Sequence, residues 1–167
     1  DSNIQVSTFA ADSPNSNRAS YITSDNLAEA KFAADEIVKQ IGDSAEYAVL
    51  ENPGQSNHDL RVTALLSYMA ENYPNMKLVG RQATNQDSKA ADSGTASIVQ
   101  ANPNLGAIWI PEAGSAEGAV AAILEAKADV LIMHADVTPA TLEHSKAGNI
   151  HMALNPNQGM QGFMGFM

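Results

Sequence analysis

The chain of 167 residues lacks cysteine and has far fewer basic than acidic residues. Without cysteine it has no disulfide, thiol nucleophile or thiolate metal site. Nine Lys and Arg residues against 19 Asp and Glu residues give a net charge of -10. Such a charge argues against a nucleic-acid or anionic-membrane partner, because phosphate binding needs clustered cations. No apolar run approaches the ~20 residues that a membrane-spanning helix requires.

Signatures of catalysis are also missing. The sequence contains no G-x-G-x-x-G after a predicted strand, no Walker loop and no H-E-x-x-H motif. In the segment GSAEG at 114–118, the serine lies in the wrong place for a nucleophile elbow. His134 and Asp136 could bind a metal, but two ligands do not define a site. We therefore predict no enzyme active site, no metal and no cofactor.

Short apolar runs alternate with segments of helical spacing about five times along the chain. Connections of a few residues between them favour an α/β fold, a three-layer doubly wound and mostly parallel sheet. An entering strand at 4–9 and a short strand at 21–23 precede this series. The predicted strands are 47–50, 76–79, 105–110, 130–133 and 150–154, and the predicted helices are 27–41, 62–73, 87–101, 114–128 and 139–147.

Polar residues follow successive predicted strands, at the sheet edge where ligands bind in α/β proteins. They are Asn57, His58, Arg61, Gln86, Glu112 and Asp136. Arg61 can donate two hydrogen bonds at once, while Asp136 and Glu112 accept them when ionised, a mixture that suits a ligand with hydroxyl groups. The alternative is that these residues are polar only because the loops of any α/β domain are solvated.

Four long segments resemble the periplasmic sugar-binding proteins of ABC importers, and in particular the ribose and rhizopine type within the type I binding-protein fold. The segments begin with ADSPNSNR, GQSNHDLRV, IVQANPNL and DVTPATLE, and they occupy 11–37, 54–62, 98–123 and 136–160. The resemblance implies two Rossmann-like lobes joined by a hinge, with a sugar bound between them. It makes this chain the C-terminal lobe, without the N-terminal lobe.

The resemblance also implies site residues. The arginine that binds sugar hydroxyls matches Arg61, and an aspartate after a late strand matches Asp136. At four other positions this sequence departs from the family. Glu112 replaces an asparagine, and the aromatic residue that forms one wall of the family's site falls near Gln86. An acidic residue of the family falls on Ala10, and a glutamine falls on Leu154. Asp12 and Asn155 lie close to those last two and join the candidate set. Glu112 suits a ligand with extra donors, such as an amine or polyol, or it pairs with Arg61.

The resemblance divides the chain into a first hinge strand at 1–9, a ligand-binding lobe at 10–154, and a second hinge crossing with the truncated start of a return helix at 155–167. The run GMQGFMGFM at 159–167 stops before a packed helix of normal length could form. Because it is apolar, we expect self-association of copies or a swapped tail. The missing N-terminal lobe would supply the rest of the site.

The resemblance implies an extracytoplasmic protein that delivers a small sugar or polyol to an ABC permease. Two alternatives stay open. The effector-binding core of a LacI-type transcription regulator resembles these lobes closely and would need a helix-turn-helix domain upstream. A small α/β hydrolase or transferase would use Asp136 with His134, although no nucleophile motif accompanies them.

Overall fold

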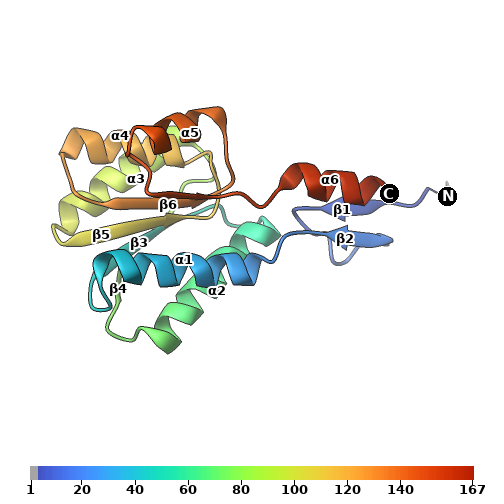
Figure 1. Ribbon diagram of the computed structural model, residues 1–167, viewed down its shortest axis with the longest axis horizontal. Coiled ribbons are helices and arrows are strands. Elements are labelled where there is room, and N and C mark those ends of the chain that lie inside the picture. Colours follow the sequence, from blue (N-terminus) through green and yellow to red (C-terminus); the bar gives the residue numbers. More distant parts are fainter. Residues whose placement is uncertain (1–3) are drawn as a thin grey trace.

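The computed structural model describes residues 4–167 and contains one five-stranded parallel sheet (Figure 1). The hinge strand expected at 1–9 begins in residues 1–3, which lie outside the described residues. The strand order is β4-β3-β5-β6-β7. The strands are β3 at Glu46–Glu51, β4 at Lys77–Ala83, β5 at Leu105–Ile110, β6 at Leu131–Ala135 and β7 at Met152–Leu154.

Helices cover both faces of the sheet, which confirms the predicted three-layer doubly wound fold. Their bounds are Asn26–Ile41 for α1, Ser56–Asn72 for α2, Ser88–Ala101 for α3, Ala116–Ala126 for α4 and Pro139–Lys146 for α5. Side chains of α1 and α2 pack with Tyr47 and Val49 of β3, and those of α3 and α4 pack with the alternate residues Ala48 and Leu50. Strand residues buried on both faces explain the continuous apolar runs in the sequence.

Two strands and one helix form a separate small unit beyond the carboxyl edge of the sheet (Figure 1). Strand β1 at Ser7–Phe9 pairs in parallel with β2 at Ser20–Ile22, and α6 at Gln158–Phe166 packs against both strands. We call these three elements the hinge unit, because they include the segments that the resemblance led us to expect as hinge crossings. The apolar run expected to be too short for a packed helix of normal length thus forms a nine-residue helix that does pack on the two strands.

Helix α2 begins at Ser56, six residues before the predicted start at residue 62. Its first two turns carry polar residues, so the apolar period that predicts a helix starts only after them. Asn57 and His58, which precede the predicted helix at 62–73, therefore belong to the first turn of α2. This start brings the amino-terminal end of α2 to the carboxyl edge of the sheet, where the predicted site residues gather.

Candidate functional site

Arg61 lies at the centre of the candidate site, with only 1% of its surface exposed. It comes from the second turn of α2 and reaches across the carboxyl ends of β5 and β6. Its Nη1 donates to the backbone carbonyl of Pro111 at 2.9 Å, and its Nε donates to Glu29 Oε2 at 3.1 Å. Nη1 also lies 3.6 Å from Asp136 Oδ1. These partners fix a buried cation at the edge where ligands bind in parallel sheets.

Asp136 follows β6 in a left-handed backbone conformation, with φ of 68°. Asp tolerates this conformation better than most residues with a side chain. Gln158 of α6 donates to Asp136 Oδ1 at 3.1 Å. Burial raises the pKa of Asp136, the nearby Arg61 opposes that rise, and the Glu29 carboxylate adds to it. Arg61 and Asp136 are the two residues that match the family pattern in the sequence, and the structure brings them into one ion pair.

Glu112 lies in the turn after β5 and has 1% of its surface exposed. Its Oε2 accepts a hydrogen bond from the Ser115 backbone at 3.2 Å, and its Oε1 is buried without a partner among residues 4–167. Burial raises the pKa of Glu112, against the effect of hydrogen bonds from Ser115 and Gly114. The predicted alternative that Glu112 pairs with Arg61 is wrong, because Glu29 and Asp136 occupy that cation instead.

The other four candidates lie around this centre without bonding to Arg61 in the described part of the chain. Asn57 is buried, and its Oδ1 has no partner within residues 4–167. Asp12 accepts from Arg18 Nη2 at 2.8 Å, and its backbone N–H donates to Ser56 Oγ of α2. Exposed Gln86 donates to Gln55 Oε1 at 3.4 Å. Exposed Asn155 accepts from the Asn157 backbone.

His58 is 2% exposed and lies within hydrogen-bond distance of two amide side chains. Its Nδ1 is 2.9 Å from Asn52 Nδ2, and its Nε2 is 3.3 Å from Gln55 Nε2. Burial, together with the charge of Arg61, lowers the pKa of His58 to about 4. The imidazole is therefore neutral at pH 7 and adds no positive charge beside Arg61.

His134 lies within β6 rather than after it, and it is fully buried. Its Nδ1 is 3.0 Å from the carbonyl oxygen of Ala135, and burial lowers its pKa. No hydrogen bond joins His134 to Asp136 among residues 4–167. The proposed catalytic pair of a hydrolase is therefore not assembled. Within the same residues, no three His, Asp or Glu side chains group as metal ligands would.

Arg61, Asp136, Glu29 and Gln158 form one cluster, which we call the polar centre. The sequence analysis missed two of its members, Glu29 and Gln158. Glu29 is the acidic residue in the first turn of α1, and Gln158 opens α6. Both α1 and α6 begin at the carboxyl edge of the sheet (Figure 1). The sequence could have indicated them only by position, because the first turns of helices that start at the same edge of a sheet lie close together. Position alone does not show which helix packs beside which.

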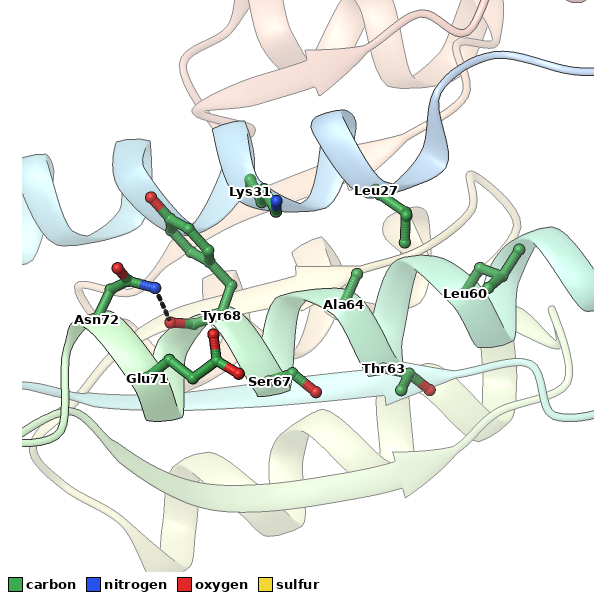
Figure 2. Close-up of a pocket in the computed structure, with 9 residues that line it drawn as sticks. All are labelled: Leu27, Lys31, Leu60, Thr63, Ala64, Ser67, Tyr68, Glu71 and Asn72. Atoms are coloured by element: carbon green, nitrogen blue, oxygen red, sulfur yellow. Dashed lines mark hydrogen bonds between the residues drawn. The ribbon is translucent and has the colours of Figure 1, made fainter.

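A hollow of about 510 Å³ lies elsewhere, in a groove between α1 and α2 (Figure 2). Leu27 and Lys31 of α1 line it together with Leu60 and Tyr68 of α2. Lys31 Nζ lies 5.8 Å from the ring centre of Tyr68. None of the candidate site residues lines this groove, so the groove and the candidate site are separate features. In residues 4–167 we find no helix with the length and apolarity needed to cross a bilayer.

The parallel sheet, the helices on both faces and the polar centre at the carboxyl edge define a lobe of the type I binding-protein class. A family model described as "periplasmic binding protein domain" matches residues 1–167. The chain belongs to that family. A curated relative, the D-apiose import binding protein of Actinobacillus succinogenes, is 31% identical over 119 residues, which cover 70% of this chain and 38% of the relative.

Solved structures carry the same fold. An arabinose-binding protein from Geobacillus stearothermophilus has a TM-score of 0.81 and 26% identity, over 88% of this chain and 51% of that one. A solute-binding protein from Actinobacillus succinogenes with bound D-allose has a TM-score of 0.80 and 30% identity, over 87% and 53%. A glucose-galactose binding protein from G. stearothermophilus, 18% identical, supports the fold alone: its TM-score is 0.87 over 98% and 59%. The chain spans about half of each solved structure.

Proposed function

We propose that this chain is the C-terminal lobe of an extracytoplasmic solute-binding protein that binds a sugar or polyol for import by an ABC permease. The buried Arg61, held at the carboxyl edge beside Asp136, is the observation that carries the proposal. A buried guanidinium and a carboxylate together donate to and accept from the paired hydroxyls of a sugar. A second lobe would close over this edge like a hinge and exclude water.

Glu112 sharpens the proposed ligand class. Its Oε1 is a buried acceptor without a partner in the described residues, and such an atom favours a ligand with a matching donor. A hydroxyl donates to a carboxylate, and an amino group also supplies the opposite charge. Asn57, Gln86, Asp12 and Asn155 are proposed to complete the contacts. The relatives are reported with D-apiose, arabinose and D-allose, so these sugars form the first panel for a binding test.

The proposed transport role is preferred over the LacI-type regulator because the named relatives are import and solute-binding proteins. It is preferred over an enzyme because no hydrogen bond joins His134 to Asp136 within residues 4–167, and the catalytic alternative relied on that pair. Delivery to a permease also requires a location outside the cytoplasm, which the family of this chain supports.

Calorimetry on a two-lobed protein that contains this chain tests the proposal, with D-allose, D-apiose and arabinose as ligands. Arg61→Gln should weaken binding of the accepted sugar by about 30-fold or more, because a hydrogen bond to a charged group contributes about 2 kcal/mol or more. Lys39→Gln removes the same charge from an exposed position and should leave affinity unchanged. Equal affinity in the wild type and Arg61→Gln would refute the proposed site.

A lone lobe carries half of such a site, so residues 1–167 by themselves are proposed to bind sugars weakly or not at all. Micromolar binding by the 167-residue chain in calorimetry would contradict this. The same chain is proposed to self-associate through α6, whose Phe163, Met164 and Phe166 are more than half exposed. Sedimentation of the chain with and without residues 159–167 tests the second point, and identical monomeric profiles would rule it out.

A further inference from the structure

Glu29 makes the shorter of the two ion pairs of Arg61. Its Oε2 lies 3.1 Å from Arg61 Nε, whereas Asp136 Oδ1 lies 3.6 Å from Arg61 Nη1, beyond hydrogen-bond distance. The Glu29 side chain is itself 17% exposed, and the Arg61 side chain is 2% exposed. The main charge partner of the buried cation is therefore a residue of α1, 32 positions before it in the sequence.

We propose that Glu29 is a positioning residue of the candidate sugar site, which holds the Arg61 guanidinium in place and leaves Asp136 available to the ligand. The part that concerns sugar binding rests on the proposed function, whereas the effect on Arg61 and Asp136 does not. The proposed role follows from the contacts of the three side chains.

Two fixed hydrogen bonds determine the orientation of a planar guanidinium. Glu29 takes the single N–H of Nε, and the Pro111 carbonyl takes one N–H of Nη1. One acceptor belongs to α1 and the other follows β5, so the guanidinium plane of Arg61 is fixed by two separate elements of the fold. The second N–H of Nη1 and both N–H groups of Nη2 then remain to donate to a ligand.

Charge balance gives the second part of the role. Because Glu29 neutralises Arg61, Asp136 is left as an acceptor that Arg61 does not hydrogen-bond. The charged groups that face Asp136 are Arg61 from α2, Glu29 from α1 and Glu112 from the turn after β5, while α6 contributes the neutral Gln158. Without Glu29, Arg61 would be free to move onto Asp136 and occupy the oxygen that a hydroxyl needs.

The chain itself permits a test without any ligand. Carboxyl carbon NMR titration follows Asp136, and proton exchange follows the Nε–H of Arg61, in the wild type, Glu29→Gln and Glu29→Ala. Glu117→Gln is the matched control, since Glu117 is also the first-turn acid of its helix, α4. Because the Glu29 charge raises the pKa of Asp136, that pKa should fall in both Glu29 variants and stay constant in the control.

The two variants separate charge from position. Gln keeps an acceptor for Nε, so Arg61 exchange should stay slow in Glu29→Gln and become at least tenfold faster in Glu29→Ala. Circular dichroism verifies that each variant folds, and Glu29→Gln alone still tests the Asp136 titration if Glu29→Ala unfolds. An Asp136 titration that is unchanged or moves upward in a folded variant would overturn the proposal, as would unchanged Arg61 exchange in folded Glu29→Ala.

In the two-lobed protein, Glu29→Ala should weaken binding of the sugar accepted from the panel by about tenfold, and Glu29→Gln should restore most of that loss. Wild-type affinity in folded Glu29→Ala would overturn the positioning role. If no sugar binds the wild-type protein, the proposed function fails, while the Asp136 titration and the Arg61 exchange still decide the role of Glu29.

Discussion

The sheet lobe and the hinge unit differ in what holds them together. Within residues 4–167, the buried side chains of the hydrophobic core all lie between Ala30 and Ile150, in the lobe. The hinge unit buries Gln161 of α6, while Phe9 and Phe163 are 52% and 60% exposed. Burial of apolar area is the main driving force of folding. The lobe therefore carries its own folding energy, whereas the hinge unit leaves large apolar side chains exposed.

The largest test of this difference removes one aromatic ring from each region. Trp109 of β5 is fully buried, so Trp109→Ala should cost about 3–5 kcal/mol of unfolding free energy. Phe163→Ala in α6 should cost less than about 1 kcal/mol, because its ring is mostly exposed. Urea unfolding followed by circular dichroism measures both losses. Tryptophan fluorescence cannot be used, because Trp109 is the single tryptophan and the Trp109→Ala variant lacks it. Equal losses would mean that the hinge unit shares the core of the lobe.

The second test uses acid, which should act on the lobe through His58. The pKa of His58 is about 4 in the folded chain against 6.5 when unperturbed, so between these values the unfolded chain binds more protons. Stability therefore rises with pH across this window and is lost on acidification. From pH 6.5 to 5 the loss should be on the order of 2 kcal/mol.

His58→Gln should remove this part of the pH dependence, and His144→Gln in α5 is the control that retains it. Urea unfolding at pH 6.5 and 5 measures the difference for each variant. The raised pKa values of Asp136 and Glu112 act in the opposite direction, since raised carboxyl pKa values favour the folded state as pH falls. A loss of the same size in wild type and His58→Gln would contradict the prediction.

The fold was predictable because its signal is repeated. Each buried strand and each amphipathic helix was expected from many residues, so errors at element ends, such as the late predicted start of α2, left the architecture intact. The meeting of Arg61 and Asp136 at one edge was predictable as well, since strand ends in a parallel sheet converge whatever the details of packing.

The partners of these two residues were not predictable in the same way. The pairing of Arg61 with Glu29 depends on α1 lying beside α2, and its contact with the Pro111 carbonyl depends on how β5 ends. Each such contact joins two residues that are far apart in the sequence. A single contact leaves no repeating pattern in the sequence from which it could be predicted. The same limit explains the wrong alternative for Glu112, whose charge suggested Arg61 while the geometry gave it the Ser115 backbone.

The smallest predicted effect sharpens the comparison with the same substitution in two helices. At Gly162 of α6, an added Cβ would make ordinary contacts, 3.8 Å and longer, with the Phe9 ring of β1. Gly162→Ala should therefore stabilise α6 by about 0.5–1 kcal/mol, through helix propensity and lower entropy of the unfolded chain. At Gly118 of α4, a Cβ would collide with the backbone oxygen of Ser88, so Gly118→Ala should destabilise the lobe by about 1–3 kcal/mol.

Amide hydrogen exchange is the measurement that resolves the Gly162 effect, because it reports each region separately. If the hinge unit opens independently of the lobe, Gly162→Ala should slow exchange of the α6 amides about two- to fivefold and leave the slowest amides of β5 unchanged. Slower exchange in β5 as well would show that α6 opens only when the lobe unfolds. In that case the two regions would be one cooperative unit, and the contrast drawn from their exposed and buried side chains would fail.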